Sequence, residues 1–145
     1  MSGSGAPPLR LARNAHEAIR REAARSYPHE GCGALLGRVE GEVSETLALP
    51  NEETESPRTR FTVSPRDYLA VEESADARGL KLLGFWHSHP DHPARPSITD
   101  RDYAWAGLLT LVIAVEQGEP REITAWDVPG PELPFRQLDL AIGVE

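Results

Sequence analysis

A short span from Phe85 to Asp100 constrains this chain more than any other part of the sequence. An apolar run at 82–86 leads into it and predicts a buried strand. Residues two apart in a strand point to the same side, so His87 and His89 would present two imidazoles on one face. Three prolines among the seven residues that follow exclude a helix or a central strand there and predict a loop.

Ser97 and Asp100 predict a helix start directly after this loop. Ser97 is a good N-cap residue, and Asp100 would fall in the first helical turn. Helical side chains tilt toward the N-terminus, so the Asp100 carboxylate can lean toward His87 and His89, and the helix dipole favours its ionised form. Two imidazoles and one carboxylate suit zinc, and three protein ligands leave a fourth position for water. The span therefore predicts a catalytic site with one zinc ion per chain.

Each of these features also has an ordinary structural explanation. Ser-x-x-Asp at a helix start is a variant of the capping box, and a His-Ser-His sequence can be a solvated strand end. The metal-site interpretation depends on the coincidence of the two patterns within one short span.

The span resembles the signature of the JAMM (MPN+) metalloprotease family, which is His-x-His, seven residues, Ser, two residues and Asp. His87 and His89 are followed by seven residues, then Ser97, two residues and Asp100. The family also has a glutamate near the end of its first helix. Here Glu30 takes that place, within the sequence Tyr-Pro-His-Glu-Gly-Cys-Gly-Ala-Leu-Leu-Gly. The resemblance extends from about residue 9 to the last strand.

This resemblance implies a zinc-dependent peptidase. His87, His89 and Asp100 would hold the ion, and Glu30 would be the general base for a zinc-activated water. Ser97 would donate a hydrogen bond to the tetrahedral oxyanion, although the same hydroxyl could cap the helix instead. Without the resemblance, Glu30 would be interpreted as an exposed loop acid.

The substrate expectation follows from the same resemblance. Family members cleave bonds at the C-terminus of ubiquitin or ubiquitin-like proteins, and eukaryotic members carry two insertions that hold ubiquitin. The corresponding parts here, 51–60 and the stretch after Trp105, are short. This compact form is similar to prokaryotic members such as the peptidase that releases cysteine from the sulfur carrier CysO. We therefore expect a ubiquitin-like or sulfur-carrier substrate with a Gly-Gly tail, and the small residues after Glu30 would leave room for that tail.

Two other classes of function remain open. A non-catalytic MPN scaffold that binds partners would typically lack the metal ligands that are present here. A zinc amidase of a small molecule would use the same zinc chemistry. A zinc deaminase would need His-x-Glu with Pro-Cys-x-x-Cys, whereas this chain has a single cysteine, Cys32.

The composition restricts the classes of binding partner and the cellular compartment that we expect. The net charge of −8 argues against a nucleic-acid surface, which needs clustered Lys and Arg. No stretch approaches the roughly 20 apolar residues of a membrane span. A single cysteine excludes an internal disulfide framework and fits a reducing, cytoplasmic compartment. Residues 1–8 are rich in Gly, Ser and Pro, and we expect a disordered tail there, followed by a single domain at 9–145.

Apolar periodicity predicts the remaining elements. One helix would be capped by Asn14 and ended by Pro28. A second would follow the cap Ser64 and end at Gly79. Strands are expected at 9–12 (an edge strand), 31–37, 43–49, 61–63, 82–86, 110–115, 122–128 and 135–142. The expected fold is mixed α/β (α+β), of the MPN/JAMM type. It would have a curved, mostly antiparallel sheet, a main helix on each side, and a short helix at the metal site.

Three further residues near the motifs have modest expected roles. Cys32 is expected to be a small buried residue. His29 is expected at the surface or just outside the site. His92 lies in the proline-rich loop but outside the motif, and we expect it to be solvated.

Overall fold

The computed structural model describes residues 8–51, 63–97, 107–128 and 134–143. Within these ranges the chain forms two helices, α1 (Arg13–Ser26) and α2 (Pro65–Ala77). The strands are β1 (Leu9–Leu11), β2 (Cys32–Gly37), β3 (Glu42–Val43), β4 (Glu45–Leu49), β5 (Lys81–Pro90), β6 (Leu109–Glu116), β7 (Glu119–Asp127), β8 (Arg136–Leu138) and β9 (Leu140–Ile142). None of the helices in the described ranges is long and apolar enough to cross a lipid bilayer.

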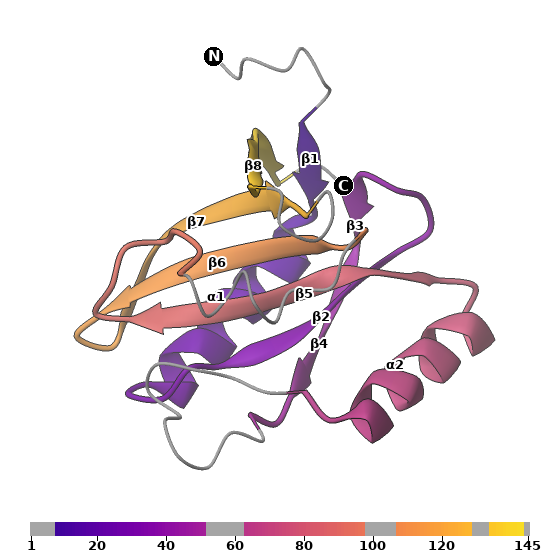
Figure 1. Cartoon of the computed structure of the whole chain (residues 1–145), viewed down its shortest axis with the longest axis horizontal. Coiled ribbons are helices and arrows are strands. Elements are labelled where there is room, and N and C mark those ends of the chain that lie inside the picture. Colours follow the sequence, from indigo (N-terminus) through magenta and orange to yellow (C-terminus); the bar gives the residue numbers. More distant parts are fainter. Residues whose placement is uncertain (1–7, 52–62, 98–106, 129–133, 144–145) are drawn as a thin grey trace.

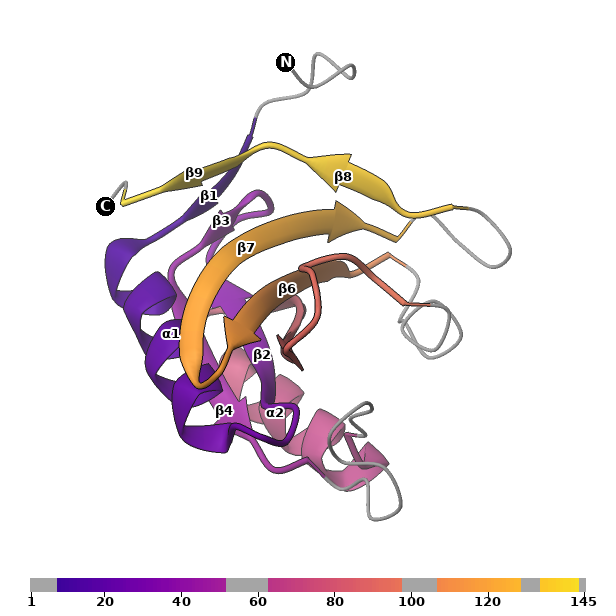
Figure 2. The same ribbon diagram turned by 90° about the vertical axis from the view of Figure 1, so that its left-hand side faces the viewer.

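The strands form two sheets. The large sheet has the order β4-β2-β5-β6-β7-β8, and all of its neighbours are antiparallel except β5 and β6. The small sheet has the order β3-β1-β9, and its strands pair in parallel. Figure 2 shows the strong curvature of the large sheet and the small sheet beside β7. The predicted α+β fold with a mostly antiparallel sheet is confirmed.

Helix α1 packs on one face of the large sheet. Three small or β-branched residues of the helix recur at helical spacing and are fully buried: Ala15, Ile19 and Ala23. They contact the alternate residues of β2, β5, β6 and β7 that point to that face, among them Leu35, Trp86, Leu111, Ile113 and Ala125. The period of two along each strand therefore matches the apolar stripe of the helix.

Helix α2 packs on the opposite face. Val71 and Ala75 contact Ala34 and Phe85, which point away from α1. The helix begins as the sequence predicts, with Pro65 in its first turn and the Ser64 hydroxyl accepting a hydrogen bond from Asp67 N at 3.1 Å. In Figure 1, α2 lies beside the end of the sheet where β5 begins. The predicted arrangement of one main helix on each side of the sheet is confirmed.

The predicted cap of α1 is wrong. The N-cap is Ala12, without a side-chain hydrogen bond, and Asn14 instead donates from Nδ2 to Ser44 O at 3.3 Å. Ala12 N donates to Val43 O at 3.0 Å, so the chain is still tied to the small sheet at this residue. Because the helix begins at Arg13, immediately after that bond, Asn14 already lies within the first turn.

Three strand predictions also need correction. The strand expected at 43–49 is divided at Ser44 into β3, which pairs with β1, and β4, which pairs with β2. β1 is the central strand of the small sheet and not an edge strand. The final strand is divided at Asp139 into β8, which pairs with β7, and β9, which pairs with β1. Asp139 O accepts a hydrogen bond from Leu9 N at 2.8 Å, so the change of sheet occurs at this residue. An alternating pattern specifies a strand but not its partners, so the sequence could not show this division.

The small residues of β2 leave no room for a substrate tail, contrary to expectation. β2 is paired on both sides, with β4 and β5, and is buried along its whole length. A side chain at Gly33 would collide with the indole of Trp86 and with Leu47 O. The space is therefore used for packing inside the protein.

Three predictions lie outside the described residues. They are the tail at 1–8 except its last residue, most of the strand at 61–63 and the short helix after Ser97.

Candidate metal and catalytic site

The two motifs meet where β2 begins and β5 ends. In the antiparallel register of these strands, Cys32 lies opposite His87. Beyond it, Ser88 N donates to Gly31 O at 3.0 Å, and Gly31 N donates to Ser88 Oγ at 2.8 Å. These bonds place Gly31 beside Ser88. Residues two apart in an extended chain point to the same side, so we infer that Glu30 lies on the face of Cys32 and of both histidines.

The three predicted site residues on this face are deeply buried. The exposed fractions are 4% for Glu30, 1% for His87 and 6% for His89. The centroids of the two imidazole rings are 5.0 Å apart. Ionisable groups are rarely buried this completely unless they are paired or bind a metal. The prediction that both histidines point to one side of a strand is confirmed.

The hydrogen bond of His89 selects the nitrogen that can bind a metal. His89 Nδ1 lies 2.8 Å from Pro93 O. A carbonyl oxygen only accepts, so Nδ1 carries the hydrogen, and in the neutral ring the lone pair is on Nε2. Metal-binding histidines commonly donate their other ring N–H to a carbonyl in this way. His89 therefore fits a metal ligand that binds through Nε2.

Glu30 is held in place through its backbone neighbours. Asn51 Nδ2 donates to Glu30 O at 3.1 Å, and Gly31 makes its two bonds to Ser88. A Cβ at residue 31 would lie 2.8 Å from Ser26 Oγ and 3.1 Å from Ser26 Cβ. The end of α1 thus packs closely against the segment that carries the glutamate.

The loop after β5 is anchored at its first residue. Asp91 has a left-handed backbone, with φ of 58°, and its N donates to Val115 O at 2.6 Å. Its carboxylate accepts from the Tyr27 hydroxyl at 2.6 Å and from Gln117 N at 2.8 Å. The loop that carries the motif from His89 to Ser97 is therefore fixed to α1 and to the β6–β7 turn.

The structure brings together part of the predicted site. Glu30, His87 and His89 share one buried face, and Ser97 is exposed near the end of the described loop. Asp100 lies outside the described residues, so its role as third ligand stays a prediction. Among the described residues alone, no three His, Cys, Asp or Glu side chains form a group that could hold a metal. The two imidazoles nevertheless fit zinc as a donor set, because His89 presents Nε2 and both rings are shielded from water.

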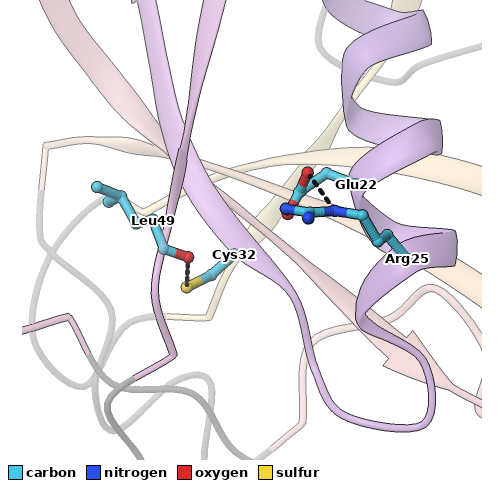
Figure 3. Close-up of polar contacts among 4 residues, drawn as sticks. All are labelled: Glu22, Arg25, Cys32 and Leu49. Atoms are coloured by element: carbon cyan, nitrogen blue, oxygen red, sulfur yellow. Dashed lines mark hydrogen bonds and ion pairs between the residues drawn. The ribbon is translucent and has the colours of Figure 1, made fainter.

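The three neighbouring residues behave as expected. Cys32 is buried, and its Sγ donates to Leu49 O at 3.6 Å (Figure 3). His29 and His92 are exposed.

Two positions escaped prediction. Ser88 was passed over as the middle residue of His-Ser-His, because its partner Gly31 is 57 residues away. Thr124 looks like an ordinary strand residue in the sequence, yet its hydroxyl donates to Ala94 O in the motif loop at 2.6 Å. Neither contact leaves a local signal in the sequence.

Fold and site together define an MPN-type domain with paired histidines and a buried glutamate. The model of the family described as prokaryotic homologs of the JAB domain matches residues 12–129. The chain belongs to this family, the compact prokaryotic branch of the JAMM/MPN proteins. The resemblance inferred from the motifs is confirmed.

Two relatives carry the names of enzymes. The chain is 30% identical over 139 residues to the desampylase of Haloferax volcanii, covering 92% of this chain and 96% of that protein. It is 37% identical over 92 residues to a probable TtuB-protein conjugate cleaving protease of Thermus thermophilus, covering 63% of this chain and 60% of that protein. With the family match, these relatives show that the chain is a JAMM-type hydrolase.

Solved structures show the same fold. Protein DSY2949 from Desulfitobacterium hafniense superposes with a TM-score of 0.81 at 28% identity, over 94% of this chain and 93% of that one. The JAB1/MPN domain protein AF2198 from Archaeoglobus fulgidus superposes with a TM-score of 0.62 at 18% identity, over 94% and 99% of the two chains. The second likeness supports the MPN fold alone.

Proposed function

We propose that this chain is a zinc-dependent peptidase that removes a ubiquitin-like or sulfur-carrier protein from its conjugates. The bond cut would be the amide or isopeptide bond after the Gly-Gly tail. The observation that carries the proposal is the burial of Glu30, His87 and His89, where β2 begins and β5 ends. A carboxylate beside two metal-binding imidazoles is the arrangement that metal-assisted amide hydrolysis requires.

The zinc ion would be held by His87, His89 and Asp100. When bound, it would polarise the scissile carbonyl and lower the pKa of a water molecule toward about 7. The Pro93 carbonyl keeps the hydrogen of His89 on Nδ1, which directs the Nε2 lone pair to the metal.

Glu30 would take a proton from the attacking water and pass it to the leaving amine. Its backbone is tied to Asn51 and, through Gly31, to Ser88, so the carboxylate needs little reorganisation. Ser97 would donate a hydrogen bond to the oxyanion, a contribution that can be worth about 3 kcal/mol. Ser97 is exposed at the end of the described loop.

The substrate class rests on the relatives and on the sheet edge. The names of both relatives refer to removal or cleavage of a protein conjugate. An extended tail can bind by adding a strand to a sheet edge. β4 is one of the two edge strands of the large sheet in the described residues, and its last residue, Leu49, contacts Cys32, which lies opposite His87. A tail paired with β4 would therefore be led toward the site.

The decisive experiment combines metal analysis with a cleavage assay. The substrate is a small sulfur carrier whose Gly-Gly tail is amide-linked to a reporter, and wild type is compared with Glu30→Gln and His87→Ala. We expect about one zinc per wild-type chain, loss of cleavage in both variants, and loss of zinc only in His87→Ala.

Each other outcome selects another class of function. Zinc without cleavage of any tailed protein, together with turnover of a short peptide amide, would identify a small-molecule amidase. Absence of stoichiometric zinc after reconstitution would exclude the mechanism and favour a non-catalytic MPN scaffold.

A further inference from the structure

The motif loop does not simply leave the sheet after β5. It crosses β6 toward β7 (Figure 1). It lies on the face of the histidines, because Ala94 packs on Val112, which lies opposite His87. Ala94, at the middle of this loop, is fully buried and packs on Val112, Ala114 and Trp126. The loop therefore packs on β6 and β7, two strands that carry no residue of the motif.

Thr124 holds the loop in this position on β6 and β7. It lies opposite Val112, which in turn lies opposite His87, so Thr124 and His87 occupy one row of the sheet. With two strand spacings between them, they are about 10 Å apart. The Thr124 hydroxyl, on β7, donates to Ala94 O at 2.6 Å. This bond therefore holds the loop from the side of β6 that is opposite β5.

A second hydrogen bond, from Trp126, holds the Thr124 hydroxyl. The indole Nε1 of Trp126 lies 2.8 Å from Thr124 Oγ1. An indole N–H can only donate, so Thr124 Oγ1 accepts there and its own hydrogen is available for Ala94 O. Trp126 and Thr124 thus form a directed pair that holds one carbonyl of the loop.

The residue that is held lies next to the carbonyl that orients a histidine. Pro93 O accepts from His89 Nδ1 at 2.8 Å and also from Arg95 N at 2.8 Å. The second bond closes a three-residue turn with Ala94 at its centre. Fixing Ala94 therefore fixes the direction in which Pro93 O points.

We infer that Thr124 is a positioning residue for the metal site. Through Ala94 it keeps Pro93 O aimed at His89 Nδ1, and so keeps the lone pair on Nε2. The inference rests on the proposed zinc site for its functional meaning, but the orientation of His89 is a property of the metal-free protein as well.

The test compares Thr124→Val, which has nearly the same shape but no hydroxyl, with Thr124→Ser, which keeps the hydroxyl. The first readout is the tautomer of His89 in metal-free protein, from imidazole nitrogen-15 chemical shifts. Wild type and Thr124→Ser should show hydrogen on Nδ1, and Thr124→Val a mixture of both tautomers. The second readout is zinc affinity by chelator competition. Loss of an outer hydrogen bond weakens metal binding by about 10-fold or more, and we expect about 10-fold for Thr124→Val.

A matched control is Thr110→Val, which changes a partly buried threonine on β6, opposite Trp126. It should leave the tautomer and the zinc affinity unchanged. An unchanged His89 tautomer and affinity in folded Thr124→Val would overturn the inference, as would an equal loss in Thr110→Val. If wild type binds no zinc, the proposed function fails, while the tautomer still decides whether Thr124 positions His89.

Discussion

The two faces of the large sheet are built from alternate residues of the same strands, yet they differ in chemistry. Along β5, Trp86 points to α1 and joins the apolar core, whereas His87 and His89 point to the opposite face. The α1 side buries only apolar side chains in the central strands, apart from Ser88. The opposite side buries a glutamate and two histidines.

The difference follows from what covers each face. Helix α1 lies along one face, and its contacts include β4, β5, β6 and β7. Helix α2 covers only part of the other face, around Ala34 and Phe85. Among the described residues, the motif loop covers another part of that face, through Ala94. One face is thus covered by a single helix and carries the apolar core, whereas the other is covered in parts and carries the predicted site residues.

The largest effect should come from breaking the α1 face. Trp86 is 1% exposed, and Trp86→Ala should lower the free energy of unfolding by about 3–5 kcal/mol, because it leaves a large cavity. Urea denaturation measures this loss, and zinc per folded chain should stay near that of wild type. His87→Ala, one residue along the strand, should show the opposite pattern, with zinc lost and the stability of the metal-free protein largely kept. Equal loss of zinc in both variants would contradict the division between the faces.

A smaller effect should come from Ser88, the polar residue that joins the two motifs. Ser88→Ala leaves the Gly31 N–H without its acceptor, and an unsatisfied buried donor costs about 1–3 kcal/mol. Because Glu30 precedes Gly31, cleavage at saturating substrate should also fall, with zinc content unchanged.

Ser44→Ala is the matched control for that change. It removes a longer hydroxyl contact, to Leu36 O at 3.5 Å, remote from the motifs. Cleavage should be unaffected in this variant. A normal cleavage rate in Ser88→Ala, despite lower stability, would show that the joint between the motifs does not position Glu30.

The smallest effect concerns pH and helix α1. Burial lowers the pKa of His16 from its ordinary value, with a further lowering by Arg20. Folding therefore favours the neutral ring. The contribution of neutral His16 to the free energy of unfolding is complete above a pH of about 6.5 and decreases as the pH falls through that value. His16→Gln should flatten the decline in melting temperature between about pH 7 and 5, without altering zinc affinity. An unchanged pH profile would exclude this contribution.

Local signals predicted much of this fold and, within the candidate site, the shared direction of His87 and His89. The apolar run before His87 and the Ser64 cap each act within a few residues, and the structure agrees with both. The loop begins one residue later than the prolines predict, because Pro90 still pairs with Val115 at the end of β5. Contacts between segments that are far apart in the sequence could not be predicted from local signals. The bond from Thr124 to Ala94 and the bond from Gly31 to Ser88 join residues 30 and 57 positions apart, and their residue types are common in any strand or loop.

The wrong predictions have the same origin. Asn14 matches a capping pattern, but Ala12 is still bonded to Val43, and that contact decides where α1 begins. Gly33 indicates space near the backbone, and Trp86 from the next strand fills it. A pattern in the sequence shows what a residue permits, while its neighbours in the fold determine which possibility is used.

The small sheet has a consequence for the order of folding. β1 is nearly the first described segment, yet it lies between β3 and β9, with Leu9 paired to Leu140. During synthesis, β1 gains its second neighbour only after residues 140–142 have left the ribosome. Closing so long a loop is slow, because entropy is lost before the contact is made. The small sheet is therefore expected to form last, against a large sheet that has already formed.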